Sequence, residues 1–305
     1  MRSDLHRSKV RFVWGAINQY GFHLFFGQLG RMIYGNDIGF AKNVLAMRDL
    51  KKQQRRSGDV ADADPRADFL RSQGYVKLDL TCSRALIEEV RRKYQALLTH
   101  PLLSRDLSPR MSNIMRGVVD PIKHIPEFQH FITPEVQRIL RAYYVSHFKV
   151  DHVRAWRNFH VPEEQRKKDV FSNLWHNDQC PVTTLKLFVC LSDGVTRENG
   201  SLRLHPIPST KKIMRLGYMR RRLTIGPARR LLEDSSHTVY FEGNLGSACI
   251  LNPQQCLHGA GVPQEGKFRD MVQFSFSPSD KPLSDDWPAT LPLDPEVSSP
   301  MPTSR

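Results

Sequence analysis

The chain has 305 residues, 40% of them hydrophobic and 9% aromatic, which fits a globular protein of one large domain or one domain with an extension. Its five cysteines, an odd number with no CxxC spacing, argue against a disulfide framework or a zinc ribbon and favour a reducing, cytoplasmic compartment. The net charge of +14 is local: residues 1–60 carry eleven Lys/Arg against four Asp, and residues 203–230 carry nine and no acid, which indicates contact surfaces.

The first 65 residues form a basic extension that we expect to be helical and to end in a linker. Apolar residues recur at helical spacing within 10–34, although glycines weaken that helix. Polar residues interrupt the stretch, so a signal sequence or spanning helix is not expected. The charged segment 47–66 ends at Pro65 and is typical of a helix end or linker.

Three roles stay open for this extension. It can be an arm packed on the domain, which is the most common arrangement of such a segment in globular proteins. It can be an interfacial helix that makes a peripheral contact with an anionic membrane. It can contact nucleic acid, but no known binding motif supports that, so no nucleic-acid partner is expected.

From residue 66 the patterns are first helical. We predict a helix over 66–73, a strand over 74–78, a helix over 83–98 with Ser83 as its N-cap, and a helix over 134–145.

From about residue 148 the pattern changes to short strands separated by turns. The predicted strands are 149–160, 184–191, 201–205, 237–242, 247–252 and 269–277, with turns at 198–201 and 242–244. Many short strands predict a cupin-like double-sheet jelly roll, so the fold class is mainly β with flanking helices, in a domain over residues 66–280. The tail, 281–305, has six prolines and few apolar anchors, and we expect it to be extended or disordered.

His176 and Asp178 lie two residues apart. On a strand, side chains at this spacing point to the same side, so both could reach one ion. With His258 they make a two-histidine, one-carboxylate set, which suits non-haem Fe(II) and leaves coordination positions open. Alone, the His-x-Asp spacing is weak, and a surface histidine beside a solvated aspartate is the simpler interpretation.

His258 precedes the small residues Gly259-Ala260-Gly261, which would leave room beside a metal ligand. The commoner fate of a single histidine is burial with a hydrogen bond to a loop carbonyl.

Arg269 begins an alternating run that places Met271, Gln273 and Ser275 on its own face. An inward arginine is costly unless it is paired, and a carboxylate would satisfy its fork of donors. The alternative is an outward arginine paired with Asp270 or Glu265.

Taken in order, these segments resemble the phytanoyl-CoA dioxygenase-like family of Fe(II)/2-oxoglutarate oxygenases, over roughly residues 66–280. The matching residues are Gly74-Tyr75-Val76, Trp175-His176-Asn177-Asp178, Glu198-Asn199-Gly200-Ser201 through Lys211, Gly246-Ser247-Ala248, Leu257-His258-Gly259-Ala260-Gly261 and Arg269. The chain departs from the family at Ala260, where many relatives have a hydroxyl residue, and at 206–210, which replaces the usual Pro-Gly-Ser-His turn.

The resemblance implies a double-stranded β-helix in which His176, Asp178 and His258 bind Fe(II) and Arg269 binds the co-substrate 2-oxoglutarate, with O2 as the oxidant. It also implies that Asn158 bonds the co-substrate. Arg154 and Trp156 share the face of Asn158 and are candidate substrate contacts. The ligand set is complete for hydroxylation of a C–H bond, with release of succinate and CO2.

The substrate is the least determined feature. The basic segment 203–230 would favour a small anionic metabolite or a lipid-like molecule, and a solvated helix face explains it nearly as well. A different class of function is a non-catalytic binding or adaptor protein for a membrane surface or nucleic acid on the same fold. The intact His/Asp/His/Arg set argues against that class. The oligomeric state is unknown from the sequence.

Overall fold

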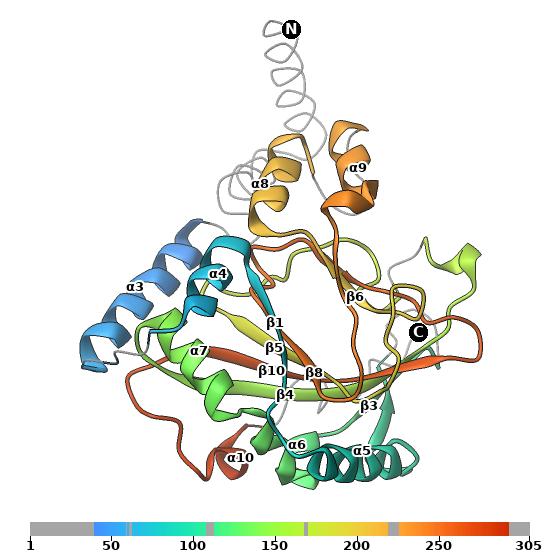
Figure 1. The fold of residues 1–305 in the computed structure, drawn as a ribbon, viewed down its shortest axis with the longest axis horizontal. Coiled ribbons are helices and arrows are strands. Elements are labelled where there is room, and N and C mark those ends of the chain that lie inside the picture. Colours follow the sequence, from blue (N-terminus) through green and yellow to red (C-terminus); the bar gives the residue numbers. More distant parts are fainter. Residues whose placement is uncertain are drawn as a thin grey trace, which may run out of the picture.

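Two antiparallel β-sheets form the centre of the molecule (Figure 1). The computed structural model describes residues 40–58, 60, 63–107, 113–167, 170–218 and 226–292. The large sheet has the strand order β1 (Tyr75–Asp79), β8 (Ser247–Leu251), β5 (Leu185–Cys190), β10 (Phe268–Ser279), β4 (His147–Phe159), β3 (Met115–Val118) and β2 (Ser104–Asp106). The small sheet has the order β7 (Val239–Phe241), β6 (Leu202–Leu204) and β9 (His258–Ala260). This double-sheet jelly roll confirms the predicted fold class.

The large sheet has an outer face covered by helices and an inner face turned toward the small sheet. On β10, Val272, Phe274 and Phe276 belong to the main hydrophobic core, whereas Met271 belongs to a separate core between the sheets. The predicted alternation from Arg269 onward is thereby confirmed. Because side chains alternate along a strand, Arg269 and Gln273 share the inner face with Met271.

Helices cover the outer face, below the large sheet in Figure 1. They are α5 (Arg84–Leu98), α6 (Pro121–His124), the 3-10 helix η1 (Pro126–Phe131), α7 (Pro134–Tyr144) and α10 (Trp287–Thr290). The Ser83 hydroxyl accepts from the backbone N–H of Leu86, so Ser83 is the N-cap of α5, as predicted. The apolar stripes of α5 and α7 pack into the main core, and this packing holds both helices against the outer face of the large sheet.

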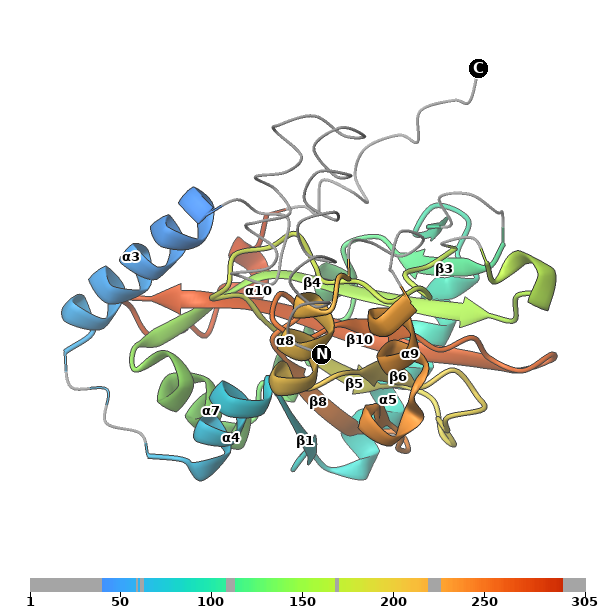
Figure 2. The same cartoon turned by 90° about the horizontal axis from the view of Figure 1, so that it is seen from above.

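Within the described residues, two helices precede β1. They are α3 (Phe40–Arg56) and α4 (Pro65–Gln73). Figure 2 shows α3 beside the end of β10, where the Ser57 hydroxyl donates to the Ser279 carbonyl at 3.1 Å. The extension is therefore helical over 40–56, and residues 1–39 lie outside the described residues. Among the helices that are described, none is both long and apolar enough to cross a bilayer.

The expectation of a disordered tail is wrong for residues 281–292. Trp287 on α10 is only 7% exposed and, with Leu291, belongs to the main core, against which Leu283 also packs. These three apolar residues anchor the segment despite its prolines. Residues 293–305 lie outside the described residues, and the domain boundaries at 65 and 280 stay predictions.

The segment between β6 and β7 forms two helices, α8 (Ile207–Arg215) and α9 (Gly226–Glu233), followed by the 3-10 helix η3 (Ser235–His237). A further 3-10 helix, η2 (Glu163–Gln165), follows β4. Both α8 and α9 lie on the small-sheet side of the molecule (Figure 1), and their apolar residues pack with Leu257, next to His258. The short strands β2 and β3 were not expected from the sequence.

Candidate metal centre

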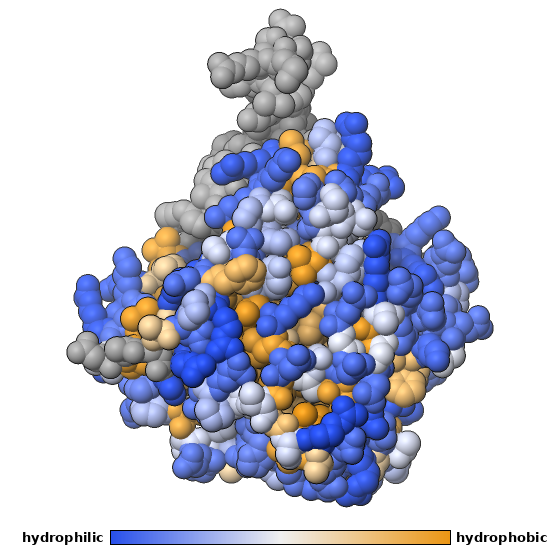
Figure 3. Space-filling view, in the orientation of Figure 1, coloured by the Kyte–Doolittle hydropathy of each residue, from blue (hydrophilic) through white to orange (hydrophobic). Residues whose placement is uncertain are grey.

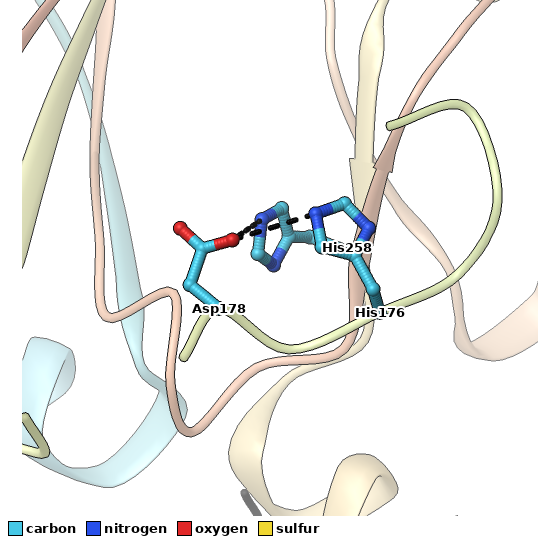
Figure 4. Close-up of side chains that lie close together, drawn as sticks. All are labelled: His176, Asp178 and His258. Atoms are coloured by element: carbon cyan, nitrogen blue, oxygen red, sulfur yellow. Dashed lines mark ion pairs between the residues drawn. The ribbon is translucent and has the colours of Figure 1, made fainter. Parts of the chain in front are cut away.

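His176, Asp178 and His258 converge on one point between the two sheets (Figure 4). The Oδ1 atom of Asp178 lies 3.4 Å from Nε2 of His176 and 3.6 Å from Nε2 of His258. Metal–ligand bonds of about 2.0–2.2 Å at right angles would separate neighbouring ligand atoms by about 3 Å. The three atoms therefore need only a small adjustment to bind one divalent ion on one face.

Backbone contacts, rather than a regular strand, place the His-x-Asp segment. His176 forms an isolated antiparallel bridge with His258, with reciprocal N–H···O bonds of 2.9 Å. The Asp178 N–H then donates to the Pro253 carbonyl at 3.0 Å. The expectation that both side chains lie on one strand is thus wrong in detail, because the second residue is in a loop, but the two side chains still face the same point.

Hydrogen bonds to carbonyls orient both imidazoles. Nδ1 of His176 lies 2.8 Å from the Leu174 carbonyl, and Nδ1 of His258 lies 3.0 Å from the Cys256 carbonyl. Because a carbonyl can only accept, each Nδ1 carries a proton, and Nε2 is the nitrogen that can offer a lone pair to a metal. Metal-binding histidines require this tautomer and this kind of outer partner. The alternative expected for His258, a hydrogen bond to a loop carbonyl, is present at Nδ1. That bond is compatible with metal binding by Nε2.

Lys186 on β5 contacts the same carboxylate from the other side. Its Nζ lies 2.6 Å from Oδ2 of Asp178. Burial would raise the pKa of Asp178, but the charge of Lys186, followed by His258, outweighs burial and holds that pKa well below its usual value. Asp178 is therefore an anion at neutral pH, as metal binding requires.

Arg269 lies on the inner face, at β10's N-terminal end. Its side chain donates to the Gly200 carbonyl and, through Nη2, to Oδ1 of Asn158 at 2.7 Å. It is 3% exposed, and no carboxylate of the described residues forms an ion pair with it. Asp270 instead pairs with Arg157 on the outer face, so the alternative of an outward Arg269 is excluded. Burial lowers the pKa of Arg269 to about 10.

Asn158 on β4 has a hydrogen-bond donor that, like one donor of Arg269, is left unused. Its Oδ1 accepts from Arg269 and, at 2.9 Å, from Nε1 of Trp156. Both partners can only donate, so this arrangement fixes which amide atom is the oxygen. Nδ2 of Asn158 and Nε of Arg269 are then buried without partners. Unused buried donors are costly, and an anionic group placed beside them would accept from both.

Trp156 supports the Arg269 end of the site, and its contact with substrate stays a prediction, as does that of Arg154. Trp156 packs in the core between the sheets and orients Asn158, which makes it a support of the Arg269 end. Arg154 lies opposite Gln273 on β10. Its part in substrate binding stays a prediction.

Sequence reasoning missed a set of polar residues on the inner face. Nε2 of His152 lies 2.9 Å from the Ser275 hydroxyl and 3.3 Å from Nε2 of Gln273. Ser275 is also the cross-strand neighbour of Lys186. With Lys186, which contacts Asp178, these residues form a polar row on the inner face. Two features of the sequence indicated these polar residues. One is Lys186, a charged residue within the otherwise apolar run 185–190, and the other is the alternation of side chains along the strand that begins near Arg269.

The small residues after His258 serve backbone packing. A Cβ on Gly261 would lie 2.6 Å from the Ser201 carbonyl oxygen and 2.9 Å from Cα of Gly200, so no larger residue fits. Gly200 itself has φ of 82°, which glycine adopts without strain. This turn presents the Gly200 carbonyl to Arg269, which gives a structural reason for the Asn199-Gly200 turn predicted from the sequence.

The basic segment 203–230 does not line the metal centre as a group. The described basic residues of α8 and α9 are exposed: Lys211, Lys212, Arg215, Arg229 and Arg230. Figure 3 shows hydrophilic side chains over much of this surface. Arg203 is the exception, because its guanidinium lies 4.6 Å from the ring of Trp175, next to His176. The solvated helix face therefore explains most of the described charge.

This arrangement has two chemically distinct ends. One is a three-ligand face for a divalent metal, with an ionised carboxylate and two imidazoles that turn Nε2 toward it. The other is a buried guanidinium and amide with unused donors, suited to a carboxylate.

A search of family models and a search of the curated proteins found no match for this sequence. Membership of the phytanoyl-CoA dioxygenase-like family therefore stays a prediction.

Solved structures share the fold. The non-haem alpha-ketoglutarate-dependent carbocyclase SnoK from nogalamycin biosynthesis is 16% identical over 77% of this chain and 94% of its own, with a TM-score of 0.51. The epimerase SnoN, solved with Fe3+, alpha-ketoglutarate and nogalamycin RO, is 15% identical over 70% and 85%, with a TM-score of 0.51. EctD from S. alaskensis is 14% identical over 71% and 77%, also with a TM-score of 0.51. At this identity the likeness establishes the double-stranded β-helix fold and leaves activity to the residues of the site.

Proposed function

We propose that this protein is an Fe(II)- and 2-oxoglutarate-dependent dioxygenase that hydroxylates a C–H bond of a small molecule. The observation that carries the proposal is Arg269, a buried guanidinium that pairs with no carboxylate of the described residues, on the inner face of the sheet against which His176, Asp178 and His258 converge. Nothing in the packing of the fold requires these four residues together. The structural relatives that use iron and alpha-ketoglutarate support the same assignment.

His176, Asp178 and His258 would hold Fe(II) through two neutral Nε2 atoms and one carboxylate oxygen, which leaves the opposite face of the ion free. With 2-oxoglutarate and O2, the iron would supply the oxidative decarboxylation to succinate and CO2 and the oxidant for the substrate. The protein contributes orientation and exclusion of water, because the neighbours of the two histidines, Trp175 and Leu257, pack with the apolar residues of α8 and α9.

Arg269 and Asn158 would bind the far carboxylate of 2-oxoglutarate. Nε of Arg269 and Nδ2 of Asn158 are the unused donors, and charge-assisted bonds from such donors are strong. The co-substrate would thus run from the metal toward the N-terminal end of β10, and its direction would be set by two rigid strands.

The substrate would then lie on the other side of the metal, over the row formed by His152, Gln273 and Ser275. Gln273 and Ser275 are buried and bonded to His152, so this wall offers hydrogen-bonding groups without large charges. Arg154, opposite Gln273, is the candidate for an anionic substrate group. The anionic preference itself rests on charge composition and is weakened by the exposure of the basic residues on α8 and α9.

The test is succinate formation from 2-oxoglutarate by the full chain with Fe(II), across a panel of small molecules that includes anionic metabolites and lipids. We expect turnover that His176→Ala and Asp178→Ala abolish while thermal unfolding stays cooperative. His237→Ala is a matched control, because His237 is a histidine of η3 outside the triad. Wild-type-like succinate production by either triad variant would overturn the iron assignment.

Two alternatives are separated by the same assay. Carbocyclase and epimerase activities occur on this fold, so the isolated product decides between hydroxylation and another oxidation. A non-catalytic adaptor is the second alternative. It predicts neither metal binding nor turnover, and the ionised Asp178 between two oriented imidazoles argues against it.

A further inference from the structure

Lys186 is the one group of the metal centre that a three-ligand iron site does not account for. It lies within a strand whose other residues are apolar, Leu185 and Leu187 to Cys190, and its side chain is 17% exposed. Burying an ammonium is costly unless it is paired. Among the described residues, its ion-pair partner is Asp178.

The carboxylate of Asp178 is divided between two environments. Oδ1 faces the two imidazoles, at 3.4 and 3.6 Å from their Nε2 atoms. Oδ2 faces away from them and lies 2.6 Å from Nζ of Lys186. Figure 4 shows the same division, with one oxygen turned to both histidines and the other turned away.

We propose that Lys186 is a positioning residue that holds Asp178 as a monodentate metal ligand, so that the coordination positions for a chelating co-substrate stay free. The inference rests on the proposed metal site. A carboxylate can bind a metal through one oxygen or through both, and binding through both would occupy a further position. An ammonium bonded to Oδ2 prevents this.

The position of Lys186 on β5 supports this role. In the sheet register it lies opposite Ser275 on β10 and Leu251 on β8, both buried, so its Nζ has Asp178 as the anion within reach. A cation beside a divalent metal also disfavours the metal while it favours an incoming dianion. Lys186 should therefore lower the affinity for the metal and raise the affinity for a dianion that binds to it.

The experiment measures two affinities on the same protein: Co(II) for the metal-free chain, and oxalate for the Co(II)-loaded chain. Oxalate chelates the metal but is too short to reach Arg269. For Lys186→Met we expect oxalate affinity to fall about tenfold or more, as for loss of a bond to a charged group, while Co(II) affinity is unchanged or tighter. Lys186→Arg, which keeps the cation, should retain most of the oxalate affinity.

Two controls separate this effect from others. Lys77 on β1 also extends from the large sheet to the small one, where its Nζ donates to the Tyr240 carbonyl, so Lys77→Met should behave as wild type. Arg269→Met should lose 2-oxoglutarate affinity but keep oxalate affinity. Equal losses of Co(II) and oxalate affinity in Lys186→Met would indicate a merely structural role and overturn the proposal, as would wild-type oxalate affinity.

A second measurement does not depend on whether a variant folds. A structure of the wild-type protein with Co(II) and oxalate should show Asp178 bound through Oδ1 alone, with Oδ2 on Lys186. Bidentate Asp178 would overturn the inference and leave the metal site standing. Absence of Co(II) binding by the wild type would instead overturn the proposed function, and the inference with it.

Discussion

Two arginines, a half-buried Arg157 and a buried Arg269, occupy neighbouring registers of the same strand pair but opposite faces of the sheet. On the outer face, Arg157 of β4 bonds both oxygens of Asp270 at 2.7 Å. On the inner face, Arg269 of β10 bonds, within the described part of the chain, the amide oxygen of Asn158 and a carbonyl. The outer pair is complete within the protein, whereas the inner guanidinium lacks an anion. A buried arginine is therefore structural or ligand-binding according to whether the fold supplies its carboxylate.

The acid–base properties of the two arginines differ accordingly. Burial opposes the charge of Arg157, but its bonds to Asp270 outweigh burial and raise its pKa. Burial lowers the pKa of Arg269 to about 10, because no comparable partner offsets it. This contrast can be tested at each side of the sheet.

The largest expected effect is on the outer face. Asp270 is 0% exposed, so Asp270→Asn keeps its shape but leaves Arg157 buried without a counter-charge. We expect the free energy of unfolding to fall by about 3 kcal/mol, measured by denaturant unfolding. The affinity of the folded protein for 2-oxoglutarate should be nearly unchanged. A loss of less than about 1 kcal/mol would show that Arg157 finds water or another partner.

The inner face should show the reverse pattern. Arg269→Met removes an unpaired buried charge, so the free energy of unfolding should change by no more than about 1–2 kcal/mol. The affinity of the Co(II)-loaded protein for 2-oxoglutarate should fall about 30-fold or more, as for truncation of a buried charge pair. Calorimetric titration measures the second quantity. Similar losses of Co(II) and 2-oxoglutarate binding would point to misfolding instead.

The lowered pKa of Arg269 predicts how binding depends on pH. A bound carboxylate favours the charged guanidinium, so above about pH 10 binding must take up a proton. The affinity of metal-free protein for 2-oxoglutarate should then be flat from about pH 7 to 9 and fall by about tenfold per unit above 10. Tryptophan fluorescence can follow the titration.

Deprotonation of Arg269 does not destabilise the fold, so it would not lower the 2-oxoglutarate affinity by unfolding the protein. Its folded-state pKa is below its unfolded value, so its charge destabilises the fold below about pH 10, and this cost is relieved as pH rises through that value. Circular dichroism over the same range checks that the fold persists. Affinity that stays constant past pH 10.5 would argue against Arg269 as the anion-binding group.

The smallest expected effect comes from the residue that orients Asn158. Trp156→Phe keeps the ring in the core between the sheets but removes the N–H that donates to Oδ1 of Asn158. We expect 2-oxoglutarate affinity to fall about fivefold, equivalent to one hydrogen bond of about 1 kcal/mol, with little change in stability. An unchanged affinity would mean that Arg269 alone orients the amide.

Much of the fold follows from local patterns in the sequence. Apolar spacing predicted α5 and α7, and the Ser83 cap lies where a capping residue was expected. The alternation from Arg269 predicted which residues of β10 face inward. These features are readable because helix and strand periodicity depend only on neighbours along the chain. The sequence also singled out His176, Asp178 and His258, whose candidate ligand atoms lie within 4.8 Å of one another.

The choice of partners required the tertiary structure. The sequence did not show that Asp270 would pair with Arg157 and leave Arg269 without a carboxylate, because that depends on the register of β4 against β10. Nor did it show that Lys186 would contact Asp178, or that three apolar residues would anchor a proline-rich tail. The sequence by itself determined which side chains share a face. Only the tertiary structure decided which of them find a partner inside the protein, since a pair such as Arg157 and Asp270 is 113 residues apart along the chain and meets only when the sheet assembles.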